Sequence, residues 1–175
     1  ILDQYVNNDN PDAHEEGTAV EIWDDFNGKI DMIVTGVGTG GTITGIAKYL
    51  KQKNPNIVIV GADPYGSILG GGDDIHPYKV EGIGYDFFPD VLDNSLVDKY
   101  IKVNDENSFD MARQLIKKEG LLCGGSSGTV VWAALQTAQK LKQGQNCLCI
   151  LADGIRNYMS KFVADEWMEK NNFKK

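Results

Sequence analysis

The sequence contains few cysteines, few histidines, no excess of positive charge and no long apolar run. Three cysteines and two histidines in 175 residues, without a CxxC pair, exclude a disulfide scaffold and a zinc site and indicate reduced thiols in the cytoplasm. Lysine and arginine total 17 against 25 acidic residues, a formal net charge of −8, whereas nucleic-acid and membrane-surface binders carry a basic face. No apolar run approaches the roughly 20 residues of a membrane-spanning helix. We therefore expect no metal, nucleic acid or membrane among the ligands.

Glycine, in contrast, is present in excess and is unevenly distributed. The chain has 20 glycines, where average usage near 7% would give about 12. Thirteen of the 20 fall in residues 36–45, 70–72, 82–84 and 124–128. Glycine is favoured where the backbone turns sharply or closely approaches a ligand. These four segments are therefore the first candidates for a binding site.

Short β-branched runs alternate with segments that have the apolar period of a helix. This order predicts an α/β fold with a parallel sheet, because parallel strands need helical crossovers. Residues 66–84 are rich in glycine and read as an irregular loop. The predicted strands are residues 30–37, 57–62, 97–103 and 147–151, and the predicted helices are residues 18–26, 42–53, 106–119, 127–142 and 160–170.

The first glycine cluster, Gly36 to Thr42, lies between a predicted strand and a predicted helix. Glycine amides and a helix N-terminus in this place form a cradle for phosphate. The same letters match the GxGxxG dinucleotide fingerprint, and Asp63 follows 22 residues after Gly41, where an acid that binds ribose would lie. Both interpretations remain open from this cluster alone, as does a tight turn that binds nothing.

The second cluster, Gly124 to Thr129, also leads into a helix. A plain dinucleotide unit has no evident use for it, whereas a cofactor held at two points does. Ser126 would offer a neutral hydroxyl to a ring heteroatom, although serine is also a common helix N-cap.

Several motifs, in the same order, resemble the cysteine synthase / cystathionine β-synthase family of fold-type II pyridoxal-phosphate enzymes. The resemblance runs from residue 1 to about 173 and implies the parallel-sheet large lobe of a tryptophan synthase β-like fold. Residues 81–87 and 153–159 fit the cystathionine β-synthase branch better than the cysteine synthases. The matching segments are residues 1–5, 38–46, 81–87, 124–128 and 153–159.

The resemblance implies roles for particular residues. Pyridoxal phosphate would be held at its phosphate by Gly38, Thr39, Gly40, Gly41 and Thr42, and at its ring nitrogen by Ser126. Gln4 would bind the substrate carboxylate, and Gly82 and Tyr85 would approach the amino-acid substrate. The implied reaction is β-replacement, in which homocysteine thiolate replaces the hydroxyl of serine to give cystathionine, with side reactions that form hydrogen sulfide.

The lysine that forms the Schiff base in this family lies upstream of the segment that Ile1 begins. The chain is therefore expected to be the C-terminal large lobe, residues 1–175, with no catalytic lysine of its own and with the upstream lobe as partner. A homodimer is the family expectation. The alternatives are a cysteine synthase-type reaction on O-acetylserine, a non-catalytic lobe kept for stability or assembly, and an NAD(P)-dependent oxidoreductase. Surface positions are expected for Lys48, Lys51, Lys53, Lys79, Lys99, Lys102 and Lys161.

Overall fold

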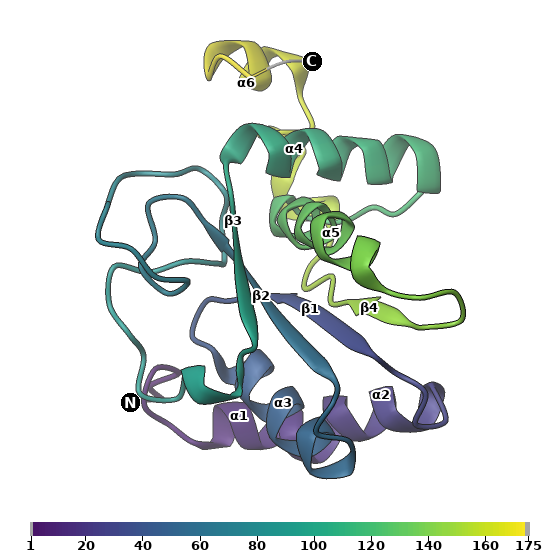
Figure 1. Cartoon of the computed structure of the whole chain (residues 1–175). Coiled ribbons are helices and arrows are strands. Elements are labelled where there is room, and N and C mark those ends of the chain that lie inside the picture. The colour runs from purple at the N-terminus through teal and green to yellow at the C-terminus, as the bar shows by residue number, and fades with distance from the viewer. Residues whose placement is uncertain (1, 174–175) are drawn as a thin grey trace.

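The computed structural model describes residues 2–173, and its centre is a four-stranded sheet in the order β3-β2-β1-β4 (Figure 1). All neighbouring strands are parallel. The predicted α/β fold with a parallel sheet is therefore confirmed. The strands are β1 (Met32–Gly36), β2 (Val58–Pro64), β3 (Lys99–Val103) and β4 (Cys147–Cys149).

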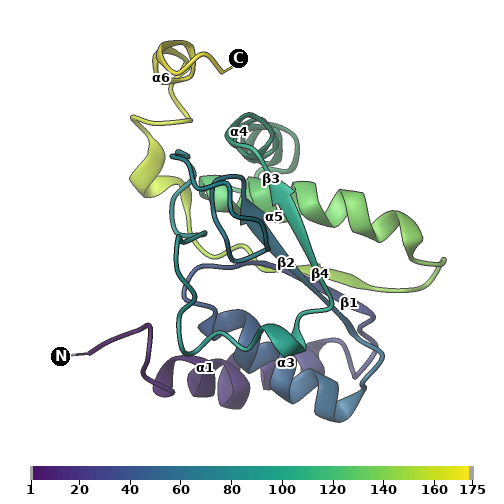
Figure 2. The ribbon, with the colours of Figure 1, turned by 60° about the vertical axis from the view of Figure 1, so that its left-hand side comes forward.

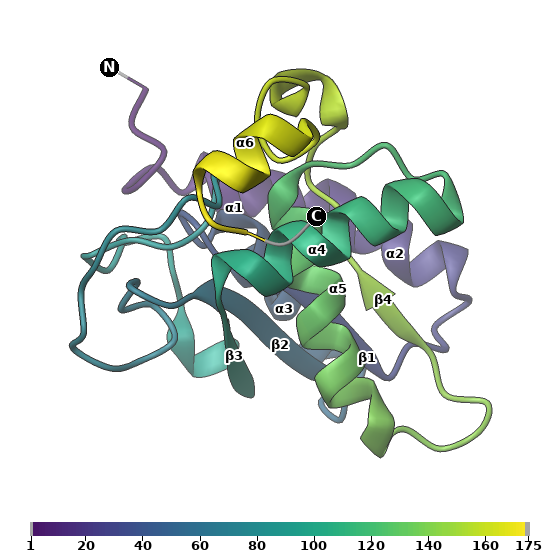
Figure 3. The same cartoon turned by 90° about the horizontal axis from the view of Figure 1, so that it is seen from above.

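Helices cover both faces of the sheet (Figure 1). One face carries a continuous helical run made of α1 (Asp9–Ala13), a π-helical turn η1 (His14–Thr18) and α2 (Ala19–Asp25), together with α3 (Gly41–Lys53). The other face carries α5 (Gly125–Thr137), and α4 (Asp105–Gln114) lies over α5 (Figure 3). The shorter elements are η2 (Asn94–Leu96), η3 (Leu115–Glu119), η4 (Ala138–Lys140), η5 (Ile155–Tyr158) and α6 (Asp165–Lys170).

The core has one apolar layer on each face of the sheet. Along β1, Ile33 faces α3 and packs in a cluster with Ile46 and Leu50. The neighbouring Val34 faces the opposite side and packs with Val130 of α5. A strand that is buried on both faces has a continuous run of apolar residues. This is why the position of β1 could be predicted from the sequence.

Two predicted helices begin at least five residues away from their expected first residue. The first begins at Asp9 and not at residue 18, because Pro11 lies in the first turn, where proline is tolerated. The terminal helix begins at Asp165 and not at residue 160, since Ala164 has an extended backbone. No helix among residues 2–173 has the length and apolar character needed to cross a membrane.

The connection from β2 to β3 is the longest irregular part of the chain. Figure 2 shows it running along one side of the molecule from the carboxyl end of β2 to the amino end of β3. Only η2 is helical within residues 65–98. This confirms the predicted loop over residues 66–84, and it places that loop beside the carboxyl edge of the sheet.

Candidate active site

A cavity of about 540 Å³ opens at the carboxyl ends of β1 and β4. The chain runs outward from β1 through β2 to β3 and then returns to the other side of β1, so the cavity lies where the strand order reverses, the usual binding crevice of such sheets. Gly41 is buried at the start of α3, whereas the other eight predicted site residues line the cavity: Gln4, Gly38, Thr39, Gly40, Thr42, Gly82, Tyr85 and Ser126.

The loop between β1 and α3 has the form of an anion cradle. Gly40 is the N-cap of α3 and has a φ of +87°, a conformation that favours glycine. The first amides of α3 have no partner within the helix and stand at its positive end. A Cβ atom at Gly38 would lie 2.7 Å from the carbonyl oxygen of Gly82. The backbones of the two predicted binding segments therefore touch at Gly38.

Asn10 connects this loop to the N-terminal segment. Its Nδ2 donates to the carbonyl oxygen of Gln4 at 2.8 Å and to Oγ1 of Thr39 at 3.1 Å. A Cβ atom at Gly41 would lie only 1.9 Å from Asn10 Oδ1. Sequence reasoning gave Asn10 no role. In the structure it fixes where Gln4 meets the cradle.

His14 also lines the cavity and was not predicted as a site residue. It is the first residue of the π-helical turn η1, a feature that is frequent at functional sites. Its Nε2 is 3.1 Å from Thr42 Oγ1, and its Nδ1 is 3.0 Å from Thr18 Oγ1. Burial lowers the pKa of His14 below its ordinary value, so the ring is neutral at pH 7. A neutral imidazole donates through one nitrogen and accepts through the other, which orients both hydroxyls.

His14→Gln is expected to reduce the loss of stability on acidification. The ordinary histidine pKa is 6.5 and the folded-state pKa of His14 is lower, so between these values the unfolded chain binds a proton that the folded chain does not. The stability from the neutral ring is complete above pH 6.5 and is lost as the pH falls through the folded-state pKa. Urea unfolding at pH 7 and pH 5 measures this. The pH-dependent drop in midpoint should be smaller in the variant, and an equal drop contradicts the prediction. The Glu15–Lys48 pair beside the ring is the same in both proteins.

Ser126 lies in the first turn of α5, and it shares the cavity with a carboxylate to which sequence reasoning gave no role. Asp153 lines the same cavity, and its Oδ2 accepts a hydrogen bond of 2.6 Å from the Tyr158 hydroxyl. Burial and this hydrogen bond raise the pKa of Tyr158, so the phenol keeps its proton. A Cβ atom at Gly124 would lie 2.0 Å from Asp153 Oδ1. Glycine at 124 therefore lets this carboxylate approach the start of α5.

The segment from Gly82 to Tyr85 forms another wall of the cavity. The Gly84 amide donates to the Val37 carbonyl at 2.7 Å, which ties this wall to the end of β1. The hydroxyls of Tyr5 and Tyr85 are hydrogen-bonded to each other at 3.3 Å. This hydrogen bond and burial raise the pKa of Tyr85 to about 12. The phenol therefore stays protonated and hydrogen-bonded across the physiological range.

Asp63 does not occupy the place that the dinucleotide interpretation requires. Its side chain has no solvent exposure and lies outside the lining of the cavity. Its Oδ2 is 2.6 Å from Lys102 Nζ and accepts from the Gly70 amide at 2.8 Å. A carboxylate sealed in this way is not free to bind a ribose hydroxyl, and this contact removes the main support for an NAD(P) site.

The same contact corrects the expectation for one lysine. Lys102 is one-fifth exposed and ion-paired with Asp63, because β2 and β3 bring the two residues into register. Lys161 pairs with Glu81 at 2.5 Å on the surface beside the cavity. Among residues 2–173, no lysine lines the cavity.

Cys123 has the surroundings of an unreactive thiol, and the cysteines among residues 2–173 take part in no metal-binding cluster. Cys123 is buried, and burial raises the pKa of its thiol, which disfavours the reactive thiolate. Within the part of the chain that the structure describes, no group of three or more metal-ligating side chains comes together.

The chain is similar in sequence to pyridoxal-phosphate-dependent enzymes. The model of the family described as pyridoxal-phosphate dependent enzyme matches residues 1–153. The chain is 56% identical over 177 residues to the cystathionine beta-synthase of Dictyostelium discoideum, covering 99% of this chain and 36% of that protein. It is 54% identical over 180 residues to that of Rattus norvegicus, covering 100% and 32%. The chain thus spans about a third of the length of these relatives.

Two further similarities concern a related activity and a solved structure. The O-acetylserine dependent cystathionine beta-synthase of Bacillus subtilis is 42% identical over 160 residues, which is 91% of this chain and 52% of that protein. The crystal structure of a hydrogen sulfide-producing enzyme from Fusobacterium nucleatum superposes with a TM-score of 0.85 at 38% identity, covering 89% of this chain and 53% of that one. The chain belongs to the pyridoxal-phosphate-dependent enzyme family, with pyridoxal phosphate as the family's cofactor and cystathionine beta-synthases among its relatives.

Proposed function

We propose that the protein containing this chain catalyses β-replacement, in which L-serine and L-homocysteine give L-cystathionine and water. In the net reaction the Cβ–O bond of serine breaks and a Cβ–S bond to homocysteine forms. The observation that carries the proposal is the convergence of the glycine cradle, Ser126, Gln4 and Tyr85 on one cavity. Cystathionine synthesis of this kind belongs to transsulfuration and cysteine biosynthesis. Release of hydrogen sulfide is a side reaction of the same chemistry.

The residues of the cavity fit pyridoxal phosphate at both of its ends. The backbone of residues 38–42 and the hydroxyls of Thr39 and Thr42 would hold the phosphate, and the lack of Cβ atoms at Gly38 and Gly40 lets this loop pack closely against Gly82 and Leu92. Ser126 would meet the ring nitrogen with a neutral hydroxyl. When bound, the cofactor supplies an electron sink for the reacting amino acid. A hydroxyl leaves that nitrogen unprotonated, which favours elimination and replacement at Cβ.

The remaining wall residues would bind and orient the amino acid. The Gln4 side chain would hold the substrate carboxylate, with its backbone held in place by Asn10. Gly82 and Tyr85 would close the other side, and the paired Tyr5 and Tyr85 rings, 5.5 Å apart between centroids, would exclude water. A dry cavity strengthens each of these polar contacts.

We further propose that the catalytic lysine comes from an upstream lobe and that residues 1–175 are the large lobe. The absence of lysine from the cavity lining within residues 2–173 supports this division. The whole protein would be a cytoplasmic homodimer. A non-catalytic role for the chain remains the competing proposal.

The test uses the full-length protein. Purified protein is expected to carry a yellow chromophore and to form cystathionine from serine and homocysteine, as measured by mass spectrometry. Borohydride reduction followed by peptide mapping should place the pyridoxyl group on a lysine outside residues 1–175. A chromophore without product would support the non-catalytic alternative, and a label on Lys102 or another lysine of this chain would overturn the division into lobes.

O-acetylserine is the second candidate for the first substrate. The name of the Bacillus subtilis relative favours it, and the reaction would differ only in the leaving group, acetate in place of hydroxide. The ratio of kcat/KM for serine and O-acetylserine, with homocysteine fixed, decides between them. A ratio above one supports serine, and a ratio below one supports O-acetylserine.

A further inference from the structure

A buried ion pair lies beneath the irregular segment that leads to Tyr85. Asp63 on β2 is inaccessible to solvent, and its register partner on β3 is Lys102. Their charged atoms, Oδ2 and Nζ, are 2.6 Å apart. The other oxygen of Asp63, Oδ1, has no hydrogen-bond partner among the described residues. A buried carboxylate is costly to desolvate, and Lys102 supplies the opposite charge beside it.

The pair also holds both ends of a turn. Lys102 Nζ donates to the carbonyl oxygen of Ser67 as well as to Asp63. Asp63 Oδ2 accepts a second hydrogen bond, of 2.8 Å, from the amide of Gly70. The ion pair therefore fixes the turn formed by residues 67–70 to the sheet. Hydrogen bonds to charged groups are about twice as strong as neutral ones.

The turn formed by residues 67–70 in turn binds the backbone of Tyr85. The Tyr85 amide donates to Ser67 Oγ at 3.0 Å, and Ser67 Oγ lies 3.1 Å from the Tyr85 carbonyl oxygen. The Ile68 amide donates to the same carbonyl at 2.9 Å. Ser67 is only 3% exposed, so water does not compete for these bonds. A continuous set of contacts thus leads from Lys102 to a residue of the cavity wall.

We propose that Asp63 and Lys102 are positioning residues, whose ion pair sets the place of the turn at residues 67–70 and, through Ser67, that of Tyr85. Neither side chain lines the cavity. The contacts support the positioning of Tyr85 by themselves. Only the consequence for an amino-acid substrate rests on the proposed function.

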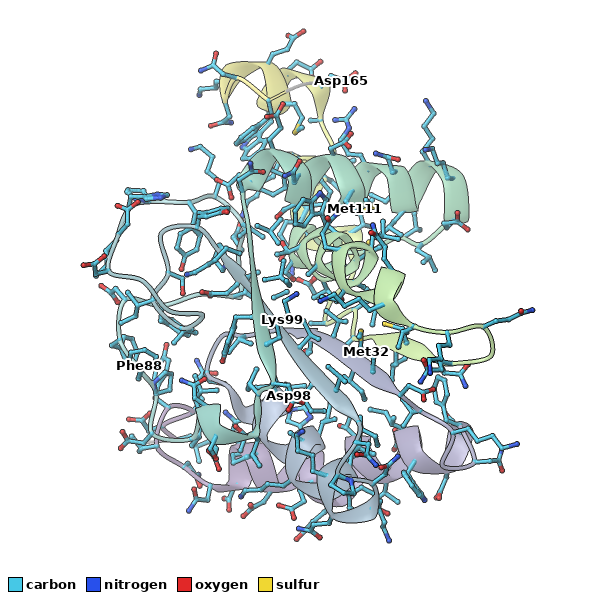
Figure 4. The ribbon with its side chains drawn as sticks, viewed as in Figure 1. Met32, Phe88, Asp98, Lys99, Met111 and Asp165 are labelled. Atoms are coloured by element: carbon cyan, nitrogen blue, oxygen red, sulfur yellow. The ribbon has the colours of Figure 1, made fainter. Side chains whose placement is uncertain are left out.

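The first test is hydrogen exchange in the full-length protein. In Lys102→Met, the amides of residues 68, 70 and 85 are expected to exchange about tenfold faster, because the turn loses its charged anchor. Lys99→Met is the matched control, since Lys99, labelled in Figure 4, lies on the same strand, is exposed and makes no ion pair with another residue of 2–173. The control should exchange like wild type at these three amides. Unchanged exchange in Lys102→Met overturns the proposal.

A double variant separates positioning from stability. Lys102→Met leaves Asp63 as an uncompensated buried charge, whereas Asp63→Asn with Lys102→Met removes both charges and should regain much of the lost Tm. The bond from Lys102 to Ser67 stays absent, so exchange at residue 85 should remain fast. A purely structural role predicts that Tm and exchange recover together, and that outcome rejects the proposal. Ser67→Ala, which leaves the ion pair intact, should also speed exchange at residue 85.

Kinetics then test the link to the substrate. With the cystathionine assay, Lys102→Met and the double variant are expected to raise KM for the amino-acid substrate about tenfold with kcat within about twofold, the pattern of a lost binding contact. Equal KM values despite fast exchange at residue 85 reject the link to the substrate. If wild type forms no cystathionine, the proposed function fails, while the exchange results still decide the positioning of Tyr85.

Discussion

Gly128→Ala is expected to lower the free energy of unfolding by about 2 kcal/mol. A Cβ atom at this position would lie 1.9 Å from the carbonyl oxygen of Ser108 and 2.6 Å from the amide nitrogen of Ala112. Both atoms are backbone atoms of α4, so α4 and α5 must move apart. Overpacking of this kind costs about 3 kcal/mol, whereas alanine in a helix gains about 1 kcal/mol over glycine. The clash therefore outweighs the gain in helix propensity.

Gly17→Ala provides a control with the opposite expected sign. Gly17 lies in the helical run η1, and a Cβ atom there would have no heavy atom within 4 Å. The same substitution should stabilise the protein by up to about 1 kcal/mol through helix propensity alone. Urea unfolding of the two variants and wild type measures both effects. A Gly128→Ala protein as stable as wild type would mean that α4 and α5 are not packed at this distance.

The role of Gly128 shows what the sequence could and could not reveal about the second glycine cluster. The pattern Gly-Gly-Ser before a helix indicated a binding site, and Ser126 does line the cavity. The sequence alone did not show that each glycine of the cluster also serves packing. Gly124 accommodates Asp153, Gly125 accommodates Phe109, and Gly128 accommodates α4. These contacts join residues far apart in the chain, so local pattern carries no record of them.

The sequence predicted those parts of the fold in which burial requires apolar residues. The central strands β1 and β2 are buried on both faces and the helices show an apolar period, so the order of these elements could be read directly. The start of the first helix was missed because Pro11 and Gly17 look like breaks, although proline fits a first turn and Gly17 lies in a π-helical turn. This omission matters for the site, since the missed residues include His14, which lines the cavity, and Asn10, which binds the backbone of Gln4.

The interpretation of Asp63 failed for a related reason. Its spacing after the first glycine cluster fits a ribose-binding acid, but the strand register pairs it with Lys102. The register of β3 against β2 depends on the long connection over residues 65–98. This connection has no periodic apolar pattern from which the pairing could be predicted. A charged residue at the end of an apolar strand, with a lysine on the next strand, was the available hint of a buried ion pair.

The close approach of two backbones at Gly38 leads to the second large effect. A Cβ atom at this position would lie 2.7 Å from the Gly82 carbonyl oxygen and 3.8 Å from the Cα atom of Ile83. The Gly84 amide bonds the Val37 carbonyl at 2.7 Å immediately beside this contact. The added methyl group cannot move away by side-chain rotation, because both neighbours are backbone. The cradle and the wall formed by residues 82–85 must therefore separate.

Gly38→Ala is expected to weaken pyridoxal phosphate binding about 100-fold, since a displacement approaching 1 Å in a binding constellation has effects of this size. Titration of the apoprotein with the cofactor, followed by absorbance, gives the Kd.

Gly154→Ala is the matched control, because Gly154 follows the cavity residue Asp153 and its Cβ atom would make an ordinary contact of 3.5 Å with the Leu122 carbonyl oxygen. The Kd of the control should lie within about threefold of the wild-type value, a change much smaller than the effect expected of a 1 Å displacement. Equal affinity of the Gly38→Ala protein would show that the cofactor phosphate is held elsewhere, and weak binding by both variants would show a general sensitivity of the cavity and not the contact at Gly38.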